Sequence, residues 1–168
     1  MKKIYFFLLA LFAFASCAKE VSIPQNATPV KEVAGIYPDY RDITIPPNIA
    51  PLNFQVTAKG DNFVGVIQGQ GVQLVAGGNE DGKLFLDSTE WRKLLTANKG
   101  RDLNVELYAE RNGQWVSFPK YVIHVAKEPI DKYLSYRLIE PSYELYRQLG
   151  IYQRDLENFE HCLLYTSP

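Results

Sequence analysis

Few side chains in this sequence have neighbours that point to chemistry, and the thiol of Cys17 is the most informative of them. It follows Phe14-Ala15-Ser16 at the end of an apolar run that starts at Ile4, after the charged start Met1-Lys2-Lys3. The run is shorter than the roughly 20 residues that a membrane-spanning helix needs. A charged start, an apolar middle and a small-residue exit are typical of an export signal. The sequence therefore predicts a signal peptide over residues 1–16, with Cys17 at the cleavage point.

The order aromatic, small, small, Cys over residues 14–17 resembles the lipobox of bacterial lipoproteins. The resemblance implies that the thiol of Cys17 is acylated and that Cys17 becomes the mature N-terminus. Several acyl chains would make the attachment long-lived, because one chain alone binds a membrane marginally. Ala18 lacks the aspartate associated with inner-membrane retention, so we expect the outer membrane, on its periplasmic or surface side. The alternative is an ordinary secretory signal in which Cys17 is incidental.

The remaining chemistry-bearing residues form no catalytic or metal-binding pattern. The only histidines are His124 and His161, and the only other cysteine is Cys162, so a set of soft zinc ligands is missing. No Gly-x-Ser-x-Gly turn is present, and the acidic residues lack calcium-loop spacing. We therefore predict no enzyme, no catalytic residue, no metal site and no cofactor in these residues, and interpret His124 as an ordinary strand side chain.

Aromatic residues are the candidates for ligand binding. The chain has 11 Tyr, 9 Phe and 2 Trp, and such rings can stack on sugars. Trp91, Tyr108 and Trp115 are the candidate binding residues, provided that their rings are exposed and coplanar. The competing interpretation places both tryptophans in the core or against a sheet.

Composition limits the class of protein. Once Lys2 and Lys3 leave with the signal, the 18 basic residues fall to 16 against 19 acidic ones, which gives a formal charge of −3. This charge argues against a nucleic-acid partner. With Cys17 carrying lipid, Cys162 has no partner for a disulfide within the chain, so the fold depends on its core.

The element pattern predicts one β-domain after a tether. Residues 17–42 contain three Pro and one Gly and are interpreted as a tether, whereas residues 43–127 show the period-two alternation of half-buried strands. The turn residues 59–62 predict a hairpin between strands near 52–58 and 63–67, and Asn112-Gly113 predicts a second hairpin with a type I′ turn.

One helix interrupts the strands. Asp87 can cap it with Glu90 as its reciprocal partner, and Gly100 ends it, so we expect a helix over residues 88–98 that closes one end of the domain. Short strands at regular spacing predict a mainly β fold: an immunoglobulin-like antiparallel β-sandwich with one short helix. The Cys…Trp…Cys hallmark of antibody domains is missing, so the prediction concerns architecture alone.

The alternation stops beyond residue 127. Residues 128–161 form an aromatic-rich connector in which Pro141 opens a predicted short helix that Gly150 closes, so the C-terminal tail is expected to be partly helical. So many apolar groups must pack against something. Either they pack back on the sandwich, or they are the interface to a domain absent from this sequence.

Residues 162–168, Cys-Leu-Leu-Tyr-Thr-Ser-Pro, resemble one translated frame of the transposon end used in sequencing libraries. We therefore expect this segment to be an artefact, and the natural reading frame to be truncated near His161. The alternative is a genuine short C-terminus.

Two groups of residues resemble a known family. One is the stretch 44–54, Thr-Ile-Pro-Pro-Asn-Ile-Ala-Pro-Leu-Asn-Phe; the other comprises Tyr136 to Pro141, Gly150 to Arg154 and Leu156 to Phe159. They resemble the N-terminal region of large bacterial lipoproteins labelled TolB-like β-propeller or cytochrome c biogenesis-like proteins. The resemblance implies a following propeller and a covalent-haem motif in a longer parent protein; neither is present in this sequence.

Three hypotheses follow. The first is a lipid-anchored, exported lipoprotein fragment whose sandwich is a non-catalytic spacer and protein-interaction module, joined by residues 128–161 to the missing propeller or to another protein partner. The second is a glycan-binding module of a polysaccharide-uptake system. The third is part of a covalent-haem redox lipoprotein.

Overall fold

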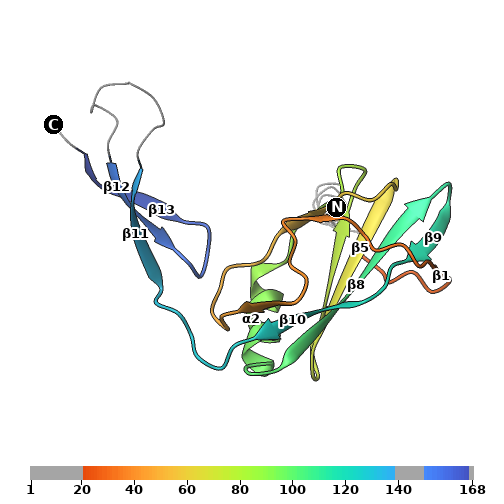
Figure 1. Cartoon of the computed structure of the whole chain (residues 1–168), viewed down its shortest axis with the longest axis horizontal. Coiled ribbons are helices and arrows are strands. Elements are labelled where there is room, and N and C mark those ends of the chain that lie inside the picture. Colours follow the sequence, from red (N-terminus) through yellow and green to blue (C-terminus); the bar gives the residue numbers. More distant parts are fainter. Residues whose placement is uncertain (1–20, 139–149, 167–168) are drawn as a thin grey trace, which may run out of the picture.

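The computed structural model describes residues 21–138 and 150–166. Over these residues it is mainly β, with three sheets and one short helix (Figure 1). The strands are β1 (Thr28–Pro29), β2 (Ile36–Tyr37), β3 (Ile43–Ile45), β4 (Phe54–Val56), β5 (Asn62–Gln68), β6 (Gln73–Gly78), β7 (Lys83–Leu84), β8 (Asp102–Arg111), β9 (Gln114–Ser117), β10 (Tyr121–Val125), β11 (Tyr133–Leu138), β12 (Gly150–Asp155) and β13 (His161–Thr166), and the helix is α2 (Ser88–Ala97). Among the described residues, no helix has the length and apolar character needed to cross a membrane.

The largest sheet is built around the long strand β8. One edge of β8 pairs with β5, which pairs in turn with β6, while its other edge is shared by β9 and β10. Strand β1 pairs in parallel with β9, and β3 pairs in parallel with β10. The break between β9 and β10 contains Pro119, as expected because proline cannot donate to a ladder.

A second sheet, with strand order β2-β4-β7, packs over one face of the first, and the two enclose the core. The alternating residues Leu103, Val105, Leu107 and Ala109 of β8 face this core, and Phe54 and Val56 of β4 face it from the other sheet. The predicted β-sandwich is therefore present.

Helix α2 forms where the sequence predicts it. The Asp87 carboxylate accepts hydrogen bonds from the backbone N–H groups of Thr89 and Glu90, both at 2.9 Å, which satisfies two of the first-turn donors. Trp91, Leu94 and Leu95 form the buried stripe. Glu90 pairs with Lys93 at 2.7 Å.

One predicted hairpin is confirmed and the other is wrong. Strands β8 and β9 turn at Asn112 and Gly113, whose φ angles of 52° and 76° suit a type I′ turn. In contrast, β4 pairs with β2 and β7, whereas β5 pairs with β6 and β8. The turn residues 59–62 thus carry the chain from one sheet to the other, and β5 forms its hairpin with β6.

The described part of the segment predicted as a tether, residues 17–42, packs on the sandwich from its first residues, with Ile23 and Ala27 against the outer face of the large sheet. It supplies β1 and β2, and Ala34 and Ile36 are buried in the core. Prolines interrupt the period-two pattern, and each of these strands is only two residues long. Strands this short cannot be recognised from alternation in the sequence.

The described part of the predicted connector supplies β11, β12 and the first residue of β13, which form a third, antiparallel sheet in the order β11-β12-β13. The helix expected from Pro141 falls on residues 139–149, outside the described residues, and Gly150 begins β12 instead of ending a helix. Most of β13 is formed by residues 162–166, which belong to the segment expected to be an artefact. In Figure 1 this sheet stands beside the sandwich and is reached by the chain that leaves β10.

Candidate functional site

The structure does not gather the residues proposed from the sequence into one site. Cys17 lies outside the described residues. Trp91 is only 1% exposed, and its ring N–H donates a 3.0 Å hydrogen bond to the carbonyl of Ile49. Trp91 is therefore a core residue that fastens α2 to the segment preceding β4.

Tyr108 and Trp115 lie on the outer face of the large sheet. Tyr108 is 8% exposed and packs with Val64 and Val66, and the half-buried Trp115 packs against this small cluster. Burial, followed by the neighbouring Glu106 carboxylate, raises the pKa of Tyr108 to about 12. These rings lie on the opposite face of β8 from the core that holds Trp91, so the three candidates do not form one platform.

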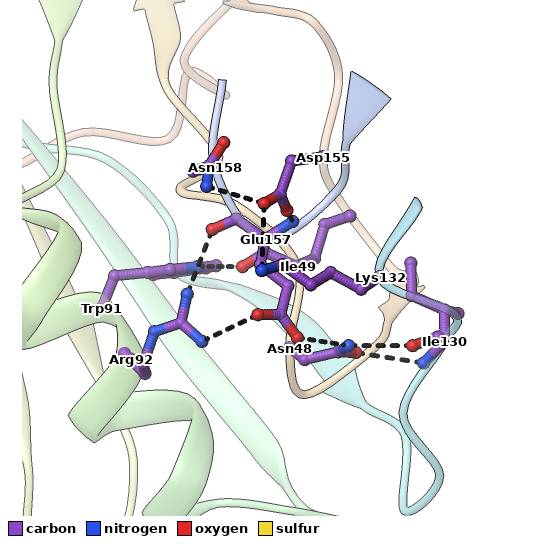
Figure 2. A network of polar contacts seen from close by, with 9 residues as sticks. All are labelled: Asn48, Ile49, Trp91, Arg92, Ile130, Lys132, Asp155, Glu157 and Asn158. Atoms are coloured by element: carbon purple, nitrogen blue, oxygen red, sulfur yellow. Dashed lines mark hydrogen bonds and ion pairs between the residues drawn. The ribbon is translucent and has the colours of Figure 1, made fainter. Parts of the chain in front are cut away.

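The structure brings together a different set of residues, where the loop between β12 and β13 meets the sandwich (Figure 2). We call this contact the joint. Its sandwich side is residues 48–50 and Arg92, and its other side is Ile130, Lys132 and residues 155–158. The backbone N–H of Ala50 donates to the carbonyl of Leu156 at 2.8 Å, and the N–H of Leu156 donates to the carbonyl of Lys132 at 2.8 Å.

Asn48 links the sandwich to two parts of the joint's other side. Its amide NH₂ donates to the carbonyl of Ile130 at 2.9 Å and to the Glu157 carboxylate at 3.0 Å, and its oxygen accepts from the N–H of Ile130 at 3.0 Å. Arg92 of α2 adds a 3.1 Å hydrogen bond to the Glu157 carbonyl and a 3.6 Å ion pair with its carboxylate. Glu157 is thus held from two elements of the sandwich.

The carboxylate of Asp155 holds the loop between β12 and β13 in its conformation. Its carboxylate accepts from the N–H of Glu157 at 2.8 Å and from the Asn158 amide at 2.9 Å, and it lies 3.4 Å from the Lys132 ammonium. Burial of Asp155 opposes ionisation, but these hydrogen bonds and the Lys132 charge outweigh it and lower the pKa of this carboxyl. The loop conformation is therefore built around an ionised aspartate.

The joint unites the sequence stretches that carry the family resemblance. Asn48 and Ala50 belong to the stretch 44–54, and Leu156 and Glu157 belong to the second group. Sequence reasoning selected these stretches without assigning them a contact. The available signal was the Asp-x-Glu-Asn spacing at 155–158, because aspartate often accepts a hydrogen bond from the backbone two residues on.

A second polar cluster lies at the end of the sandwich. His124 of β10 places one ring nitrogen 2.7 Å from the Asp102 carboxylate of β8 and the other 3.0 Å from Asp42, which precedes β3. Hydrogen bonds to Asp42 and then to Asp102 raise the pKa of His124. The ring is shared by two carboxylates, which suits a structural clamp better than a base, because a base needs an unshared nitrogen facing a substrate.

Within residues 21–138 and 150–166, no group of three or more His, Cys, Asp or Glu side chains is arranged to hold a metal ion. Comparisons with protein-family models, with curated proteins and with solved structures find no match to this chain.

Proposed function

We propose that this chain belongs to a membrane-anchored lipoprotein, in which the β-sandwich is a non-catalytic spacer and protein-interaction module between a lipid at Cys17 and a C-terminal part. The lipobox-like residues 14–17 support the anchor. The observation that carries the spacer role is the joint. A spacer has to hold the part that follows it at a fixed place relative to the anchor. The joint supports this role, because Asn48, Ala50 and Arg92 bind the C-terminal sheet to the sandwich.

The C-terminal sheet offers a surface for the interaction role. Leu134, Tyr136 and Leu138 alternate along one face of β11, and Tyr152 lies opposite Tyr136 with the two rings stacked at 5.7 Å. Leu134 and Leu138 are 51% and 44% exposed. Apolar side chains gathered on one face favour contact with another protein surface. In the family that the sequence resembles, the adjoining part is a propeller.

The glycan-binding alternative draws little support from the arrangement. It requires exposed, coplanar rings, and Trp91 and Tyr108 are both buried. The haem alternative concerns residues of the longer parent protein, so we keep it as an implication of the resemblance alone.

The spacer role is tested by the rigidity of the joint. Nitroxide labels at Thr96→Cys on α2 and Ser135→Cys on β11, in a chain that starts at Ala18 and carries Cys162→Ser, report the distance between the sandwich and the C-terminal sheet. We expect one narrow distance distribution from pulsed electron spin resonance. Asn48→Ala with Arg92→Ala should broaden it, because both side-chain links to Glu157 are lost.

Lys93→Ala is the matched control, because Lys93 lies beside Arg92 on α2 but pairs with Glu90 outside the joint. It should leave the distribution narrow. A broad distribution in the unaltered chain would contradict the spacer role, because the C-terminal part would then be only loosely tethered.

A further inference from the structure

The start of the described chain lies across the outer face of the large sheet. Ile23 and Ala27 pack against the cluster of Val64, Val66 and Tyr108. Strand β1 then pairs with β9, and the N–H of Val30 donates to the carbonyl of Ser117 at 2.9 Å. The segment from Val21 onward is therefore part of the folded domain.

Val21 lies at the edge strand of this sheet. A Cβ on Gly77 of β6 would come within 2.8 Å of a Val21 methyl group, so the two residues are in close contact. Gly77 is next to the end of β6, where Gly78 leads into the exposed turn that contains Glu80. The described chain thus begins beside one end of β6.

The distance from Cys17 to this point is limited by covalent geometry. Val21 is four residue-to-residue steps from Cys17, and a fully extended chain covers about 3.5 Å per step, or about 14 Å in total. A free tether over residues 17–42 would instead place the domain at a typical distance of about 25–30 Å, given about 5–6 Å times the square root of 25 residues. The packed segment removes most of that freedom.

We propose that the lipidated chain holds its sandwich against the membrane, with the end of β6 near Val21 facing the lipid headgroups. The inference rests on the proposed lipid at Cys17. It makes the domain a membrane-contacting base of fixed orientation. The turn at Glu80 then lies near the lipid surface, and Gln70, at the opposite end of the β5–β6 hairpin, points away from it. Strand β6, which lies between these two positions, has six residues and covers about 20 Å.

Energy transfer to the membrane tests this orientation. The full chain is produced in a Gram-negative bacterium, purified in its lipidated form with Cys162→Ser, and placed in vesicles of phosphatidylethanolamine and phosphatidylglycerol. A donor dye is attached at Glu80→Cys or Gln70→Cys, and the acceptor is carried by labelled phosphatidylethanolamine headgroups. We expect clearly stronger transfer from position 80. Equal transfer from the two positions would overturn the inference.

Two variants test whether the short, packed segment before β1 sets the orientation. Insertion of twelve Gly and Ser residues between Ala18 and Lys19 should abolish the difference between the two positions while the chain still floats with vesicles. Ile23→Asp should do the same, because it releases the segment from the outer face. A difference that survives both changes would contradict the role of the packed segment.

The anchor itself is scored separately by flotation. Lipidated chain that floats with vesicles but shows equal transfer refutes only the orientation. Chain that carries no lipid and does not float refutes the proposed anchor, and the orientation with it.

Discussion

The side chain of Asn48 pairs with the backbone of Ile130 in both directions, donating at 2.9 Å and accepting at 3.0 Å. The amide thereby acts as a strand neighbour would, over a separation of 82 residues in sequence. The same NH₂ group also reaches Glu157. A single polar residue before β4 thus fixes both the chain that leaves β10 and the loop that follows β12.

Replacing Asn48 should loosen the joint. Asn48→Asp keeps the shape but removes both donated hydrogen bonds and sets a second carboxylate beside Glu157. We expect a local loss of about 1–2 kcal/mol at this half-exposed position, which corresponds to faster amide exchange by a factor of about 5–30 at Leu156. Hydrogen exchange followed by NMR measures it. Asn104→Asp, at an exposed position of β8, is the control, and unchanged exchange at Leu156 would count against the joint.

His124 should make stability depend on pH. Its folded-state pKa is raised above the ordinary value of 6.5 by Asp42 and Asp102, so the unfolded chain releases its proton first as pH rises. The stabilisation is therefore fully present below the ordinary pKa and is lost as pH rises through the raised value. The urea midpoint of the unaltered chain should fall across this window relative to His124→Gln.

His161→Gln is the control for this titration, because His161 lies in β13, away from Asp42 and Asp102. It should reproduce the pH profile of the unaltered chain. If His124→Gln also reproduces it, the clamp contributes nothing to stability.

Asn98 and Gly69 should be energetically coupled. Asn98 is fully buried, donates to the Leu94 carbonyl at 2.8 Å and accepts from the N–H of Gln70 at 2.7 Å. Asn98→Ala leaves these groups unpaired and should cost about 2–3 kcal/mol. Gly69→Ala should also destabilise, because its Cβ would overlap the Asn98 amide.

The double variant distinguishes this contact from general strain. The stability cost of Gly69→Ala should be smaller by at least about 1 kcal/mol in the Asn98→Ala background, because substitutions at residues in contact do not have additive effects. Gly65→Ala is the control, because its Cβ meets neighbours only at 3.5 Å; its cost should be the same in both backgrounds. Additive costs for Gly69→Ala would contradict the predicted overlap.

The parts of the fold that the sequence predicts are those with local causes. Asp87 and the stripe at Trp91, Leu94 and Leu95 are sufficient to predict α2 to within a residue. Asn112-Gly113 predicts its turn because few other pairs adopt positive φ twice. Alternation also gives the inward face of β8 correctly.

The parts that the sequence does not predict depend on distant partners. Alternation at Phe54 to Val56 shows a strand but not its neighbours, so β4 was assigned to the wrong hairpin. In the sequence, Asn98 looks like any polar residue at a helix end. Its contact with Gly69 becomes visible only in the folded structure. Asn48 and Glu157 lie 109 residues apart, and no local pattern connects them.

Attachment of the sandwich to a membrane by lipid is tested by the mass of the mature N-terminus. Chain purified from the membrane fraction of a Gram-negative bacterium is digested, and its N-terminal peptide is analysed by mass spectrometry. We expect a peptide that begins at Cys17 and carries a diacylglyceryl group, and a Cys17→Ser chain that lacks this group and leaves the membrane fraction. A mature chain that begins elsewhere, or an unmodified Cys17 thiol, would rule out the lipid anchor.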